Sequence, residues 1–119
     1  MISLKKYLKY LLTIVEASSI SLLLLIFILV LSGYGILYPA QIRVLTGGLI
    51  SERLAYKIHT DKIIRMSTIT LLFIHGYSGI LLLIERRVRR ALMKRIMILC
   101  ITILIVYLYI LLVLLDLLR

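Results

Sequence analysis

The chain has 119 residues, of which 63% are hydrophobic, and a formal net charge of +10. Its mean hydropathy of +1.15 is more than a soluble core of this size can bury. The single cysteine, Cys100, excludes an intrachain disulfide framework and a cysteine metal site. A water-soluble globular fold is therefore excluded, and the sequence predicts an all-α integral membrane protein.

Three apolar segments are long enough to cross a bilayer, which requires about 20 residues. We expect one membrane domain, residues 1–119, with three transmembrane helices joined by an outer loop and a cytoplasmic basic loop. The predicted spans are about 10–31, 63–84 and 96–115, with the outer loop at 32–60 and the basic loop at 85–95.

The distribution of charge predicts the orientation. The segment 85–95 carries six Arg or Lys residues, which marks it as cytoplasmic under the positive-inside rule. Three crossings then place the N-terminus in the cytoplasm and the C-terminus outside, in a multi-pass protein of the cell membrane. Because the basic residues lie beside membrane ends, anionic lipid accounts for them, and we expect no nucleic-acid partner.

The outer loop is expected to contain local structure. Gly33, Gly35 and Pro39 are predicted to end the first helix, since glycine permits unusual backbone angles and proline lacks an amide donor. After Gly47 and Gly48, apolar residues of the segment 49–58 gather near one side of a helix. This pattern predicts an amphipathic helix on the outer membrane interface.

His75 lies near the centre of the second span, where an ionisable side chain is costly and normally faces a partner. Gly76 and Gly79 lie beside it and one turn along, so that a planar group or another helix can approach closely. A neutral imidazole with open backbone beside it is what a b-type haem requires. The alternative is a histidine that forms a hydrogen bond to a neighbouring helix.

His59 is the second candidate ligand, 16 residues before His75 at the outer end of the span. On a continuous helix the two are about 24 Å apart, so one haem cannot easily take both. The chain has only two histidines, so a bis-histidine haem needs a second copy or a different protein. A methionine is the other option for the second ligand: Met66, Met93 or Met97.

Arg65 is the deepest basic residue near the outer rim, and if haem is present it is the best candidate to neutralise a propionate. The alternative is interfacial anchoring, in which the charged head reaches back toward water.

Several short segments carry a resemblance to a known family. They are Leu-Ser-Gly-Tyr-Gly-Ile-Leu-Tyr-Pro at 31–39, Leu-Thr-Gly-Gly-Leu-Ile at 45–50, Ile-His at 58–59 and Phe-Ile-His at 73–75. The pattern resembles small archaeal b-type cytochrome membrane proteins, which are similar to the haem-binding anchor subunits of respiratory dehydrogenases and hydrogenases. The resemblance covers roughly 31–79 and implies that His59 and His75 are both axial ligands. The chain departs from the four-helix cytochromes, which take ligand pairs from two helices of one chain.

The sequence and the resemblance together predict a membrane subunit that carries electrons through haem b between a quinone pool and a redox partner. Such a chain is at most the electron-transfer subunit of an oxidoreductase, as a homodimer or within a respiratory membrane complex, and quinone is a second candidate ligand. One alternative is a cofactor-free structural subunit of a larger membrane complex. Another is a small oligomeric proton or cation channel or transporter lined by Glu16 and His75.

Overall fold

The computed structural model describes residues 4–118, and over this range the chain is helical without strands. Three helices are long and apolar enough to cross a membrane: α1 (Leu4–Leu37), α4 (Lys62–Arg87) and α5 (Ala91–Leu117). Each contains one of the predicted spans. The prediction of an all-α chain with three membrane-spanning candidates is therefore confirmed.

The helices are longer than the apolar segments that predicted them. α1 has 34 residues, which at 1.5 Å per residue gives about 51 Å. The hydrocarbon core of a bilayer is only about 30 Å thick. α1 is thus long enough to continue into the interface or to cross the membrane at a tilt.

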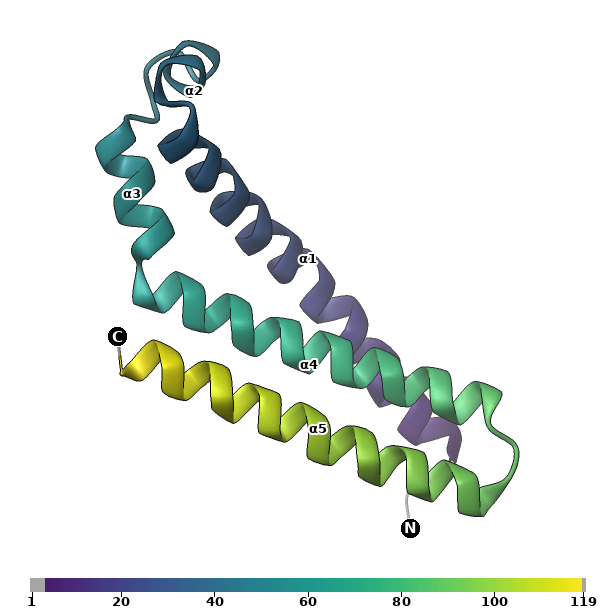
Figure 1. Cartoon of the computed structure of the whole chain (residues 1–119). Coiled ribbons are helices and arrows are strands. Elements are labelled where there is room, and N and C mark those ends of the chain that lie inside the picture. The colour runs from purple at the N-terminus through teal and green to yellow at the C-terminus, as the bar shows by residue number, and fades with distance from the viewer. Residues whose placement is uncertain (1–3, 119) are drawn as a thin grey trace.

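α4 is the central helix, since it packs against both α1 and α5, which have little contact with each other. Figure 1 shows that α1 and α4 lie together over part of their length and then diverge, and that α3 (Glu52–Thr60) occupies the angle between them. The start of α1 and the connection between α4 and α5 lie at one end of the molecule. The end of α5 lies at the other, near the junction of α3 and α4.

The expectation for Gly33 and Gly35 was wrong, because the first helix does not end there, whereas its end just before Pro39 is as expected. α1 continues through Gly33 and Gly35 to Leu37, and Pro39 begins the short helix α2 (Pro39–Leu45). A helix tolerates an interior glycine at a cost of about 1 kcal/mol, and here both glycines allow close approach of α3. The true turn is at Gly47 and Gly48, whose φ angles of 61° and 87° suit residues without a Cβ.

The predicted helix of the outer connection is present, but it spans Glu52–Thr60 rather than 49–58. Ser51 caps its start, with Oγ accepting from Leu54 N at 3.3 Å. Asp61 ends α3 and begins α4, because its backbone leaves the helical conformation and its Oδ1 accepts from Ile64 N at 2.9 Å. α3 buries Ala55 on its α1 side, and its place at a membrane interface stays a prediction.

The interior consists largely of small and polar residues. Ser18, Ser32, Thr68 and Ser78 are buried together with a few aliphatic side chains. Membrane helices pack through such residues, because lipid offers no hydrophobic driving force between helices and close approach supplies the contact energy. α5, in contrast, has no buried residue. Most of its surface is thus available to lipid or to another protein.

Two ion pairs tie α4 to α5 at their two ends. Arg65 Nη2 lies 2.6 Å from Asp116 Oδ1, and Lys94 Nζ lies 2.7 Å from Glu85 Oε2. The second pair closes the turn at Val88–Arg90, which joins the helices through three residues outside either helix. These contacts fix the antiparallel register of α4 and α5.

Candidate functional site

His75 faces α1 from the middle of α4. Its Nδ1 lies 3.0 Å from Ser18 Oγ, and Ser18 is only 6% exposed. The contact is a hydrogen bond between neighbouring membrane helices, as the alternative interpretation of His75 expected. It uses one ring nitrogen, and no hydrogen bond from Nε2 to residues 4–118 is found.

His59 faces the C-terminal half of the same helix. Its Nδ1 lies 3.1 Å from Ser32 Oγ and 3.1 Å from the carbonyl oxygen of Leu29. A Cβ at Gly33 would lie 3.3 Å from His59 Cε1. The glycine therefore lets the imidazole lie close against the backbone of α1. Like His75, His59 is held in place by contacts of its Nδ1 with α1.

An apolar groove of about 460 Å³ runs along the C-terminal half of α1 beside His59. Apart from the histidine, its lining comes from one face of α1. The lining residues are Ile26, Leu29, Val30, Gly33, Tyr34, Leu37 and His59. The groove could hold a large apolar cofactor, and the imidazole of His59 at its edge could bind the metal of such a cofactor.

The two histidines lie at different depths. Their partners Ser18 and Ser32 are 14 residues apart on α1, which corresponds to about 21 Å along the helix. A metal–nitrogen bond is about 2 Å long, so two imidazoles on one iron lie about 4 Å apart. His59 and His75 of one chain therefore cannot ligate the same iron, even though the helix between them breaks at Asp61.

Gly76 and Gly79 face open space. A Cβ at either position would have no neighbour within 4 Å among the described residues. Neither glycine is therefore needed for packing among residues 4–118. Their role in admitting a planar group or another helix stays a prediction.

Arg65 is engaged within the chain. Its Nε and Nη2 donate to Asp116 Oδ1 at 3.0 Å and 2.6 Å, and its Nη1 donates to the carbonyl oxygen of Thr60 at 2.6 Å. These contacts link α5 to the junction of α3 and α4. They give Arg65 a structural role, and its pairing with a propionate stays a prediction.

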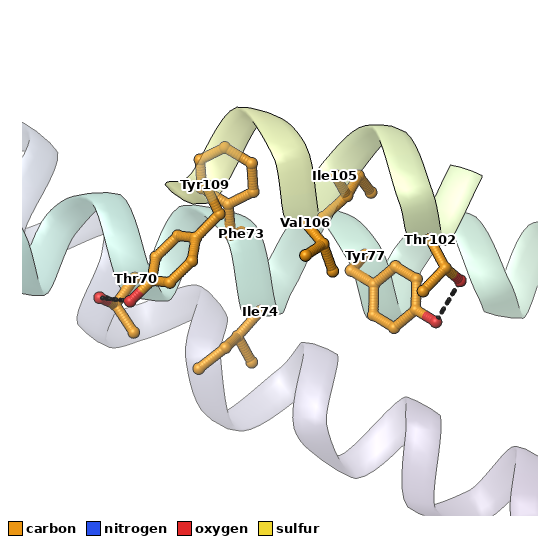
Figure 2. Close-up of a pocket in the computed structure, with 8 residues that line it drawn as sticks. All are labelled: Thr70, Phe73, Ile74, Tyr77, Thr102, Ile105, Val106 and Tyr109. Atoms are coloured by element: carbon orange, nitrogen blue, oxygen red, sulfur yellow. Dashed lines mark hydrogen bonds between the residues drawn. The ribbon is translucent and has the colours of Figure 1, made fainter. Parts of the chain in front are cut away.

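A second apolar groove, of about 350 Å³, lies between α4 and α5 (Figure 2). A hydroxyl pair lies toward each end: Tyr77 with Thr102 at 2.8 Å, and Thr70 with Tyr109 at 3.1 Å. Phe73 meets Tyr109 edge to face, with ring centroids 5.4 Å apart. Tyr77 thus faces α5, whereas His75, two residues and about 200° earlier on α4, faces α1.

Sequence reasoning missed Ser18, Ser32 and Gly33 as parts of the histidine sites. None is unusual as a residue type, but the two serines are two heptads apart on α1, which places them near one face of the helix. That spacing was the available signal. Within the part of the chain that the structure describes, no three His, Cys, Asp or Glu side chains form a metal-binding group.

Comparison with protein-family models, curated proteins and solved structures finds no match to this chain. The class of protein is therefore defined by the structure and composition alone. Three apolar helices with largely exposed hydrophobic side chains indicate a multi-pass protein in a lipid bilayer.

Proposed function

We propose that the chain is a haem-binding membrane subunit that carries electrons between a quinone pool and a redox partner, with His59 and His75 as axial ligands. The observation that supports this most is that Nδ1 of each imidazole lies within hydrogen-bonding distance of an oxygen on α1. Iron-ligating imidazoles use one ring nitrogen for the metal and the other for such a hydrogen bond. Haem, when bound, supplies an iron that gains and loses one electron.

The two histidines serve separate haems in this proposal, because they are about 21 Å apart along α1. The second ligand at each site would come from another chain, and we propose a twofold homodimer that would bring equivalent histidines together. Symmetric dimers are the commonest oligomers and repeat one patch on both subunits. The open backbone at Gly76 and Gly79 leaves room for a group on the α4 surface.

The groove between α4 and α5 is the place we propose for quinone exchange. It is apolar, it carries aromatic rings at Phe73 and Tyr109, and its ends hold hydroxyl groups. Apolar walls with a few polar groups are typical of sites for flat organic ligands. Tyr77→Phe is expected to slow reduction of the protein by a quinol, while reduction by dithionite stays unchanged.

We also propose that the N-terminus lies in the cytoplasm and the C-terminus outside the cell membrane. The basic connection between α4 and α5 and the start of α1 lie at one end of the molecule (Figure 1). Both carry the Lys and Arg residues that favour the cytoplasmic side.

The haem proposal is tested by visible spectroscopy of the protein purified in mild detergent. Oxidised and dithionite-reduced spectra and the ratio of haem to protein are measured for the wild type, His59→Ala and His75→Ala. Tyr107→Ala, an exposed position on α5, is the control. We expect one haem per chain on average, with about half lost in each histidine variant and none in the control.

Two other results are informative. One haem per two chains that disappears only in His75→Ala would restrict ligation to the middle of the membrane. A protein that stays colourless after reconstitution with haemin would contradict the proposal.

A cofactor-free structural subunit of a larger membrane complex is the second candidate. The observation in its favour is that both histidines already bond α1 without a cofactor, and that α5 leaves a long apolar surface free. It predicts that the chain co-purifies with partner proteins through α5. It also predicts that His59→Ala and His75→Ala affect stability alone.

A further inference from the structure

Two serines of α1 make matching contacts with the two histidines. Ser18 Oγ lies 3.0 Å from His75 Nδ1, and Ser32 Oγ lies 3.1 Å from His59 Nδ1. Both serines are buried, at 6% and 3% exposure. The two contacts join α1 to different helices, α4 and α3. The same pairing of a buried serine on α1 with a histidine Nδ1 therefore occurs twice in the chain.

The direction of each hydrogen bond follows from the second partner of each serine. Ser18 Oγ donates to the carbonyl oxygen of Ile14 at 2.7 Å, and Ser32 Oγ donates to that of Leu29 at 2.9 Å. A carbonyl oxygen can only accept, so the single hydroxyl proton is used there. With the hydroxyl proton on the carbonyl, the lone pairs of Oγ face the imidazole, and the contact is a hydrogen bond when Nδ1 carries the proton.

His59 gives independent support for this assignment. Its Nδ1 is also 3.1 Å from the carbonyl oxygen of Leu29. That oxygen has no proton to offer, so a hydrogen bond requires the proton on His59 Nδ1. Both neutral imidazoles are thereby left with a free lone pair on Nε2.

We infer that Ser18 and Ser32 are positioning residues, which hold His75 and His59 in the Nδ1–H tautomer and leave each Nε2 available as a ligand. The role in iron ligation rests on the proposed function. The tautomers themselves do not, since they follow from contacts within the chain. A hydrogen bond from Nδ1 also makes the imidazole a more basic ligand, which favours ferric over ferrous iron.

The test uses the full chain, labelled with ¹⁵N-histidine, in detergent micelles without haem at a pH where both imidazoles are neutral. The ¹⁵N chemical shifts and their couplings to ring protons report which nitrogen is protonated. Because the chain has two histidines, His59→Ala and His75→Ala assign both sets of signals. We expect Nδ1–H as the main tautomer at both positions.

Ser18→Ala should shift the His75 signals toward the Nε2–H tautomer and leave those of His59 unchanged. Ser18→Thr, which keeps the hydroxyl, should restore the wild-type signals. Ser32→Ala should affect His59 alone and less strongly, since the carbonyl of Leu29 remains as an acceptor. Ser19→Ala is the matched control, because Ser19 Oγ bonds only its own helix, at Val15 O.

A protein with bound haem provides a second readout. Loss of the hydrogen bond in Ser18→Ala should move one midpoint potential to more positive values, and Ser18→Thr should reverse the change. Nε2–H as the main wild-type tautomer at either histidine would overturn the inference for that site. If the Nδ1–H tautomer is found but the protein does not bind haem, the inference about the serines holds and the proposed function is contradicted.

Discussion

Gly35→Ala should separate α3 from α1. A Cβ at this position would lie 2.6 Å from the Cβ of Ala55, which is fully buried at 0% exposure. Carbon atoms without a bond between them prefer about 3.5–4.0 Å, so the two helices would have to move apart by about 1 Å. Neither Cβ can rotate away, because each is fixed to its backbone.

The cost follows from two opposing effects. Overpacking a well-packed interface lowers stability by about 1–3 kcal/mol. Replacing glycine by alanine in a helix interior raises stability by about 0.5–1 kcal/mol. We therefore expect Gly35→Ala to lower the free energy of unfolding by about 0.5–2 kcal/mol, which is each end of the first range less the same end of the second. Reversible unfolding in mixed micelles with increasing SDS, followed by circular dichroism, measures this change.

Gly76→Ala is the matched control, since a Cβ there meets nothing within 4 Å. It should leave stability unchanged or raise it slightly. The double variant Gly35→Ala/Ala55→Gly removes the clash, and its coupling energy should be about 1 kcal/mol or more. If Gly35→Ala is as stable as Gly76→Ala, the close contact of α1 with α3 does not exist as described.

Three further predictions concern α5 and the orientation of the chain. Arg65→Met should destabilise the protein by about 3 kcal/mol, because it leaves Asp116, whose side chain is only 11% exposed, without its cation, whereas Arg65→Met/Asp116→Leu should cost much less. Tyr77→Phe should cost about 0.6 kcal/mol, a typical value for a hydrogen bond between membrane helices. In a background without the native cysteine, Tyr56→Cys should react with a membrane-impermeant maleimide on intact cells, and Arg89→Cys should react only after the cells are opened.

Each of these predictions has a result that contradicts it. Equal destabilisation by the single and double Arg65 variants would show that Asp116 without its cation carries no penalty. No change, or a gain of stability, in Tyr77→Phe would show that its hydroxyl has no partner on α5. Labelling of Arg89→Cys from outside would reverse the proposed orientation.

The sequence predicted the membrane helices well because their signal is local. Each span is an apolar run longer than about 20 residues, which needs no knowledge of its neighbours. The ends of α1 were harder, since Gly33 and Gly35 are read locally as helix breakers. Their effect here depends on His59 and Ala55, which approach from another helix.

The histidine sites could be predicted only in part. His59 and His75 stand out because ionisable residues in a membrane segment are rare. Their partners on α1 are common residue types, but Leu11, Ser18, Leu25 and Ser32 recur every seven residues. Three of them are buried and Leu25 is half-buried. This heptad pattern marks the packed face of α1. It therefore predicts that both serines lie where α1 meets its neighbouring helices.

The break at Asp61 decides where His59 points. On one continuous helix, 16 residues would turn His59 about 160° away from His75, so both could not face α1. Asp61→Ala removes the cap of α4, a loss of about 1 kcal/mol, and introduces the residue that best favours a continuous helix. If the cap causes the break, the ¹⁵N signals of His59 should lose their Nδ1–H character while those of His75 keep it. If both histidines are unchanged, the packing of Ala55 against Gly35 imposes the break, and Gly35→Ala should then perturb His59 instead.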